Sequence, residues 1–193
     1  MKVTKAQAQA NRAHIVETAS ALFRERGFDG VGVADLMAAA GFTHGGFYKH
    51  FGSKADLMAE SASCGFANSS ESLGEMDAAA FLGHYLSREH RDNPGQGCTM
   101  AALCSDAARQ PTSVKQAFAT GIEAQLAAGQ WHHAQVEATA AQGARAERIA
   151  LIAQAVGAIV LSRSCPDDSS LAEEILEVCR ADVLARLSRA PDA

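Results

Sequence analysis

The sequence predicts an all-α protein in which a small N-terminal three-helix domain precedes a larger helical bundle. Beyond residue 56, apolar residues recur at three- and four-residue spacing and do not alternate as they do in a β-strand. Glycine, serine and proline clusters interrupt this pattern and mark turns. The 193-residue chain is 48% hydrophobic and 20% charged, as in a folded globular protein. We place the domains at residues 1–54 and 55–193.

The N-terminal segment predicts a helix-turn-helix unit. Apolar residues share one face of a first helix over residues 6–26, and Gly27 caps its C-terminal end. A second, short helix follows in the stretch VADLMAAA. We expect Gly41 to end this helix in the left-handed conformation that a sharp turn between helices needs.

Residues 41–57, with the sequence GFTHGGFYKHFGSKADL, contain the most informative pattern in the chain. Thr43 is placed to cap a third short helix that runs to Phe51. Ser53 is placed to cap a fourth, with Asp56 at the capping-box distance. Two short helices joined by a tight glycine turn, after a longer supporting helix, form a helix-turn-helix.

The side chains of this segment suit contact with DNA. Gly45 and Gly46 leave the start of the third helix bare, so that the backbone can approach DNA and His44 can reach the major groove. Tyr48 can donate a hydrogen bond to a phosphate. Lys54 lies in the first turn of the fourth helix, where the helix dipole also favours an anion.

Residues 10–60 resemble the TetR/AcrR family of repressors, and the remainder of the chain resembles it loosely. The resemblance implies that the third helix recognises operator DNA. It implies contacts to base edges and nearby phosphates from Thr43, His44 and Gly45, and anchoring of the DNA backbone by Tyr48, His50 and Lys54. The chain departs from the family at Gly32, where serine or threonine more often caps the second helix.

Charge is unevenly distributed along the chain. The net charge is −5, but residues 1–54 carry seven Lys and Arg against four acids, whereas residues 55–193 carry ten against eighteen. The first segment is therefore +3 and the second −8. Because DNA is a polyanion, only the N-terminal domain is expected to meet it.

The C-terminal bundle is predicted to contain helices near residues 53–68, 76–92, 98–109, 112–130, 144–164 and 168–188. The last two carry more apolar surface than one core needs, and the resemblance implies that they form a four-helix dimer interface. We expect a homodimer joined through Ile152, Val156, Ile159, Ile175, Cys179 and Val183. A monomer with a fully buried terminal helix is the alternative.

A pocket for a small-molecule effector is expected among the helices between residues 53 and 130. The candidate lining residues are large apolar or sulfur-containing ones, and each also suits plain core packing. They are Phe66, Phe81, Tyr85, Met100, Cys104, Phe118, Ile122 and Trp131.

The five cysteines show no CxxC spacing, which argues against a structural metal or a disulfide framework. The stretch GCTMAALCSD resembles the corresponding helix of TetR-like proteins, some of which sense electrophiles through cysteine. Cys98 and Cys104 lie six residues apart on one helix, so a disulfide between them would not close. Buried inert thiols and an electrophile sensor both remain open.

These observations predict a ligand-responsive DNA-binding regulator, a repressor that a small molecule releases from its operator. The alternatives are a cysteine-based redox or electrophile sensor of the same fold, a non-DNA-binding interaction protein, and an enzyme. No histidine or cysteine cluster has the spacing of a catalytic or metal site, so we expect no enzyme activity, metal or cofactor. The apolar stretch 149–161 is too short for a membrane span and no signal segment is present, so we expect a cytoplasmic protein.

Overall fold

The computed structural model describes residues 4–71, 77–127 and 141–188, and every regular element in these ranges is a helix. The all-α prediction is therefore confirmed for the described residues. Within the same ranges, no helix is both long and apolar enough to cross a membrane.

The chain forms two compact units that do not follow the order of the sequence. Unit 1 combines residues 1–69 with residues 98–122, and unit 2 combines residues 70–97 with residues 123–193. The division at 54/55 stays a prediction about function. The compact units have other boundaries, because residues 98–122 pack against the N-terminal segment.

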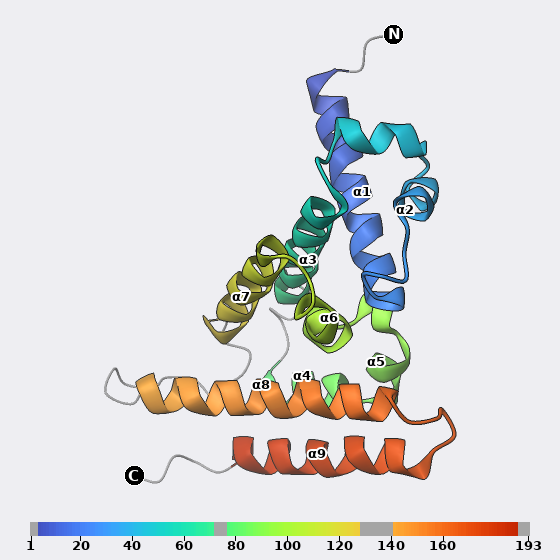
Figure 1. Cartoon of the computed structure of the whole chain (residues 1–193). Coiled ribbons are helices and arrows are strands. Elements are labelled where there is room, and N and C mark those ends of the chain that lie inside the picture. The colour runs from blue at the N-terminus through green and yellow to red at the C-terminus, as the bar shows by residue number, and fades with distance from the viewer. Residues whose placement is uncertain (1–3, 72–76, 128–140, 189–193) are drawn as a thin grey trace. The chain divides into compact units, whose positions relative to one another are not determined.

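Unit 1 contains the predicted helix-turn-helix (Figure 1). Its elements are α1 (Lys5–Arg26), α2 (Val33–Ala39), the 3-10 helix η1 (His44–Lys49), α3 (Lys54–Glu71), α6 (Thr99–Ala107) and α7 (Thr112–Ala127). The last residues of α3 and of α7 belong to unit 2.

The predicted helix ends of unit 1 are observed. Gly27 follows α1 with φ +74°, and Gly41 follows α2 with φ +79°. The turn after α2 has the hydrogen bonds of a Schellman motif, in which the Phe42 amide donates to the Met37 carbonyl (2.8 Å). At the start of α3, the Ser53 hydroxyl accepts from the Asp56 amide (3.2 Å).

The core of unit 1 is formed mainly by aromatic and long aliphatic side chains from α1, α2, η1 and α3. The fully buried members include Ile15, Phe23, Phe28, Leu36, Met37, Phe47 and Leu57. These side chains set the angles between the short helices, since isolated helices of this length are marginal in water.

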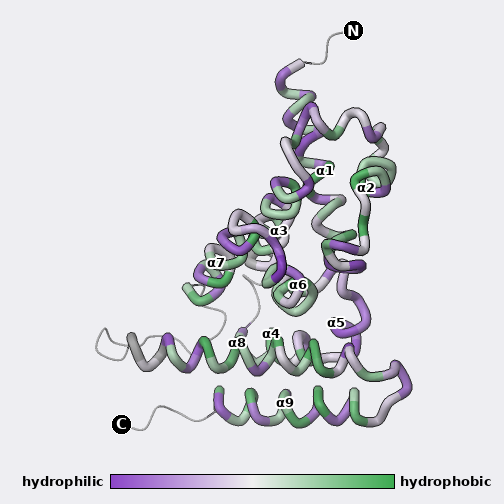
Figure 2. The backbone as a smooth tube through the Cα atoms, in the orientation of Figure 1, coloured by the Kyte–Doolittle hydropathy of each residue, from purple (hydrophilic) through white to green (hydrophobic). Residues whose placement is uncertain are grey.

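Unit 2 contains the long terminal helices. Its elements are α4 (Ala78–Tyr85), α5 (Arg88–Asp92), the 3-10 helix η2 (Pro94–Gln96), α8 (Ala141–Arg163) and α9 (Ser170–Ser188). Figure 1 shows α8 and α9 side by side and antiparallel, and Figure 2 shows apolar and polar residues interspersed along both. The Gln154 amide donates to Asp182 (2.8 Å) and the Ser162 hydroxyl donates to the Ala172 carbonyl (2.8 Å), which fixes their register.

Buried polar groups connect α5 to α8 within unit 2. The Arg163 guanidinium on α8 donates to the carbonyls of Arg91 (2.7 Å) and His90 (2.9 Å). Arg91 is itself only 4% exposed and is paired with Asp92 (2.9 Å). Separation of α5 from α8 would break these bonds and leave the guanidinium of Arg163 without its partners, which is costly inside a protein. The bonds therefore hold α5 to α8.

Two predicted helices differ from the observed ones. The single helix predicted for residues 76–92 is two helices, because the Ser87 hydroxyl accepts from the His90 amide (3.2 Å) and starts a new helix after Tyr85. The third helix of the N-terminal segment is a 3-10 helix rather than an α-helix. Its six residues include Gly45 and Gly46, which disfavour a regular α-helix.

Candidate nucleic-acid interface

The segment η1 is attached to the core of unit 1 by two buried phenylalanines. Phe47 is 1% exposed and Phe51 is 3% exposed, and their ring centroids lie 5.4 Å apart. Their burial fixes the rotation of the segment about its own axis. The opposite side of η1 is consequently directed away from the core of unit 1.

The exposed side of η1 carries the predicted DNA-contacting residues Thr43, His44, Gly45 and Tyr48. Tyr48 is 67% exposed, and its ring packs edge-on against Phe47 (5.2 Å between centroids) and His44 (6.2 Å). The phenol is thus held in place at its base and directed outward. It can donate a hydrogen bond to a group outside the protein.

The two glycines of η1 have different surroundings. A Cβ atom at Gly46 would lie 3.5 Å from the Met37 side chain, so Gly46 packs closely against α2. A Cβ atom at Gly45 would meet nothing within 4 Å. Gly45 has no positive φ either, and the fold of the chain therefore does not require glycine there.

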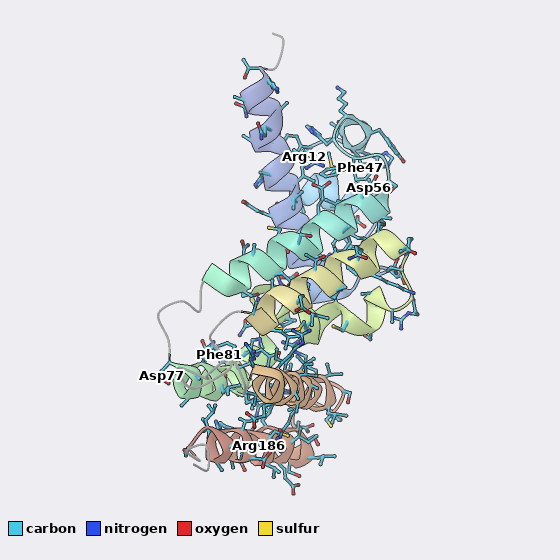
Figure 3. All side chains as sticks on the ribbon, turned by 90° about the vertical axis from the view of Figure 1, so that its left-hand side faces the viewer. Arg12, Phe47, Asp56, Asp77, Phe81 and Arg186 are labelled. Carbon is cyan, nitrogen blue, oxygen red and sulfur yellow. The ribbon has the colours of Figure 1, made fainter. Side chains whose placement is uncertain are left out.

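Arg12 fixes the C-terminal end of η1 to its neighbours (Figure 3). Its guanidinium donates to the His50 carbonyl (3.3 Å), forms an ion pair with Glu60 on α3 and lies 4.8 Å from the centre of the Phe51 ring. One side chain thus holds η1 between α1 and α3. Arg12 and Glu60 are not recognisable from the sequence, because a lone arginine and a distant glutamate form no local pattern.

Thr43 and His50, two further predicted DNA contacts, lie at the two ends of η1. Thr43 precedes η1, but its side chain makes no capping hydrogen bond; instead its carbonyl accepts from the Gly46 amide (2.9 Å). This is the shorter spacing of a 3-10 helix. His50 is half-buried, and its ring tilts against Phe51 (6.2 Å between centroids). Both residues still border the exposed side of η1.

Lys54, the predicted phosphate anchor, has a partner within the chain. Its ammonium donates to the Phe28 carbonyl (2.6 Å) and lies 5.9 Å from the centre of the Phe23 ring. A lysine ammonium has three donors, so this bond leaves two for other acceptors. The anchoring role stays a prediction, and Lys54 also has a role in the fold.

The predicted effector-lining residues fall in both units. Unit 1 contains Phe66, Met100, Cys104, Phe118 and Ile122, and unit 2 contains Phe81 and Tyr85. Trp131 lies outside the described residues. The rings of Phe66 and Phe118 pack edge-on at 5.4 Å, and those of Phe81 and Tyr85 lie 5.6 Å apart, so these four residues act as core partners within their units.

The apolar surface of α8 and α9 lies at other positions than predicted. Ile152, Ile159 and Val183 are at most 7% exposed in the chain by itself, because they pack inside unit 2. Val156, Ile175 and Cys179 are half-buried. The large apolar residues exposed on these helices are Ile149, Val160, Leu161, Leu171 and Val178.

Comparisons with known proteins agree with this architecture. Residues 15–60 match the family described as bacterial regulatory proteins, tetR family. The chain is 40% identical over 57 residues to the HTH-type transcriptional regulator AcrR of Shigella flexneri, a match over 30% of this chain and 26% of that protein. It is 44% identical over 55 residues to TtgR of Pseudomonas putida, over 28% of this chain and 26% of that protein. The match thus spans about a quarter of the length of these relatives.

Solved structures extend the likeness beyond the N-terminal segment. A TetR-family regulator from Agrobacterium tumefaciens aligns with a TM-score of 0.71 and 21% identity, over 94% of this chain and all of that one. The reduced form of Escherichia coli NemR aligns with a TM-score of 0.69 and 21% identity, over 90% of this chain and 95% of that one. At this identity the likeness concerns the fold. The helix-turn-helix segment thus matches the tetR family of bacterial regulatory proteins, and nearly the whole chain has the fold of solved TetR-family regulators.

Proposed function

We propose that the chain is a DNA-binding transcriptional regulator that reads its operator with η1. The observation that carries the proposal is Gly45, an exposed glycine in an exposed helix that the protein's own packing does not require. A bare backbone at this place lets DNA approach closely. His44 and Tyr48 flank it on the same exposed side.

The electrostatics of the chain suit this assignment. The exposed Lys49 on η1 and the positive balance of residues 1–54 favour contact with phosphates, and the acidic remainder disfavours it. DNA is thereby directed toward the helix-turn-helix and away from the acidic part of the chain.

The proposal is tested by selection of duplexes from a random-sequence pool with the purified full-length chain. We expect enrichment of a pseudo-palindrome whose half-sites lie one helical turn apart, roughly 34–36 Å, or slightly more. Binding to the enriched duplex should weaken steeply with salt, because phosphate contacts release counterions. Failure to enrich any sequence would overturn operator binding.

We further propose that the regulator is a homodimer joined through the exposed apolar stripe of α8 and α9. The stripe consists of Ile149 and Val160 on α8 with Leu171 and Val178 on α9, each at least 44% exposed. Residues 171 and 178 lie seven apart, and residues 149 and 160 eleven apart, so each pair stays near one face of its helix. Exposed apolar residues on both helices suit burial against a second copy.

Sedimentation at micromolar concentration tests the dimer. We expect about twice the chain mass of 20.2 kDa for the wild type and a shift toward the monomer for Val178→Glu. The matched control is Ala79→Glu, which adds the same charge at an exposed position of α4. A monomeric wild type would contradict both the dimer and the two-half-site operator.

A small molecule is proposed to release the regulator from DNA by binding one arrangement of the helices better than another. Typical coupling of roughly 1–3 kcal/mol would change operator affinity about 5–150-fold. A thermal-shift screen of small apolar compounds and electrophiles can identify the effector. Linkage then requires the enriched duplex to weaken effector binding by the same factor, and equal affinities with and without DNA would exclude an inducer.

A cysteine-based sensor is the second candidate, and Arg24 is the observation that favours it. The Arg24 guanidinium, whose pKa is lowered by burial, lies within electrostatic reach of Cys64 and Cys98. Cys98 occupies the N-cap of α6. Burial raises the pKa of Cys104 to about 11, which keeps that thiol protonated and unreactive. Among solved relatives of this fold, NemR has been crystallised in a form described as reduced.

The sensor is tested by alkylating the folded protein with iodoacetamide and locating the label by mass spectrometry. We expect Cys98 to react and Cys104 to resist. If the sensor exists, alkylation of the wild type lowers affinity for the enriched duplex, and Cys98→Ser abolishes this effect. Unchanged affinity after complete Cys98 alkylation would reject it.

A further inference from the structure

Phe28, in the connection between α1 and α2, is held at both of its backbone polar groups by side chains from other helices. Its amide donates to the Asp106 carboxylate on α6 (2.9 Å), and its carbonyl accepts from the Lys54 ammonium on α3 (2.6 Å). The residue is completely buried. The path of the chain into the helix-turn-helix is thus fixed by two charged groups far away in sequence.

The ring of Phe28 is fixed as well. It packs edge-on against Phe23 of α1 (5.1 Å between centroids) and Phe118 of α7 (6.4 Å), and Phe118 packs edge-on against Phe66 of α3 (5.4 Å). Gly121 makes room for this cluster, since a Cβ atom there would lie 2.2 Å from the Phe66 ring. All these residues belong to unit 1.

Asp106 is closely fitted to the connection that it holds. Its second carboxylate oxygen pairs with Arg109 (2.7 Å), and the side chain is 19% exposed. A Cβ atom at the preceding residue, Gly27, would lie 2.6 Å from the Asp106 oxygen, and Gly27 has φ +74°. The backbone of the turn and the carboxylate can therefore meet at this distance only because residue 27 is glycine.

We propose that Asp106 is a positioning residue for DNA recognition, which sets the orientation of the helix-turn-helix on α6. The inference rests on the proposed operator binding. It makes α6 and the beginning of α7 part of the DNA-reading unit, although α6 begins fifty residues after the end of η1. A displacement of α6 would reach the α1–α2 connection directly through one hydrogen bond, in addition to any path along α3.

The test compares Asp106→Ala and Asp106→Asn in the full-length chain with the control Arg109→Ala. Asparagine retains an acceptor for the Phe28 amide, alanine removes it, and the control removes only the ion pair on the other oxygen. The measurements are amide hydrogen exchange at Phe28, the affinities for the enriched duplex and for a random-sequence duplex, and the salt dependence of both.

We expect Asp106→Ala to expose the Phe28 amide to exchange. It should lower affinity for the enriched duplex about tenfold, because DNA binding must then order the released connection at a cost comparable to one hydrogen bond. Binding to the random-sequence duplex and the salt slope should stay unchanged, because Asp106 contacts no phosphate. Asp106→Asn and Arg109→Ala should bind the enriched duplex within about twofold of the wild type.

Two failures can be told apart. If the wild type enriches no duplex, operator binding itself is wrong and this role falls with it. If the wild type enriches a duplex and folded Asp106→Ala retains the ratio of specific to random-sequence affinity, Asp106 serves stability alone and the positioning role is wrong. If Asp106→Ala does not fold, Asp106→Ser, which also shortens the side chain, is measured in its place. The same ratio of specific to random-sequence affinity then decides.

Discussion

The Arg12 guanidinium on α1 donates to the backbone carbonyl of His50, the residue that ends η1. The same guanidinium pairs with Glu60 on α3. A single 3-10 helix such as η1 has too few internal hydrogen bonds to hold its own orientation. The neighbouring helices α1 and α3 fix that orientation through Arg12.

Replacement of Arg12 by alanine should lower both stability and operator affinity. The loss removes a hydrogen bond, a partly exposed ion pair and the packing over Phe51, which together amount to roughly 1–2 kcal/mol of unfolding free energy. Denaturation in urea measures the first effect, and fluorescence anisotropy with the enriched duplex measures the second. Arg109→Ala, which removes the ion pair between Asp106 and an exposed arginine after the end of α6, is the control. Equal DNA binding by wild type and folded Arg12→Ala would contradict the support role.

Gly45→Ala should separate DNA binding from folding. Because a Cβ atom there meets nothing within 4 Å, the unfolding free energy should stay the same or rise by up to about 1 kcal/mol through helix propensity. Affinity for the enriched duplex should fall about tenfold or more, since the methyl group would stand between backbone and DNA. Gly83→Ala in α4, another position with open space, is the matched control. Undiminished affinity in Gly45→Ala would remove the main support for the proposed interface.

Lys54→Ala tests two roles of one side chain. Loss of the bond to the Phe28 carbonyl should lower the unfolding free energy by roughly 1–2 kcal/mol. If the ammonium also contacts a phosphate, binding weakens for all sequences and the salt slope falls by about 1. Lys115→Ala, at an exposed position of α7, controls for the change in net charge. A stability loss with an unchanged salt slope would show that Lys54 acts only within the fold.

His90 should make stability depend on pH. Burial lowers its pKa to about 4, against 6.5 for the ordinary group, while its ring donates to the Tyr85 carbonyl (2.7 Å). Between pH 6.5 and 4 the unfolded chain takes up a proton that the folded chain refuses. The unfolding free energy therefore falls as pH falls through this window, by up to about 3 kcal/mol, and His90 adds no further pH dependence above it.

The measurement is urea denaturation from pH 4.5 to 7.5 of the wild type and His90→Asn. The difference between the two slopes isolates His90 from the carboxylates, which titrate in both proteins. His84→Gln, at an exposed position of α4, should reproduce the wild-type slope. A wild-type slope in His90→Asn would show that another group is responsible.

Local sequence was sufficient to predict most helices and the ends of several. Apolar spacing identified α1, α2, α6 and α9 to within a few residues, and Gly27 and Gly41 have the positive φ that their places demand. Capping by Ser53 was predictable for the same reason. Each of these features depends on residues within one or two helical turns, and a single sequence contains that information.

The sequence by itself thus determined the helical class, the helix-turn-helix and the residues exposed on η1, because period, caps and the aromatic pattern are properties of neighbouring residues. Only the tertiary structure decided which distant residues hold that segment, as Arg12 and Asp106 do, and which unit α6 joins. It also decided that Ile152, Ile159 and Val183 are buried while Val160 and Val178 are exposed. A helix with apolar residues on two sides does not specify which side meets its own core, because that choice depends on packing against helices elsewhere in the chain.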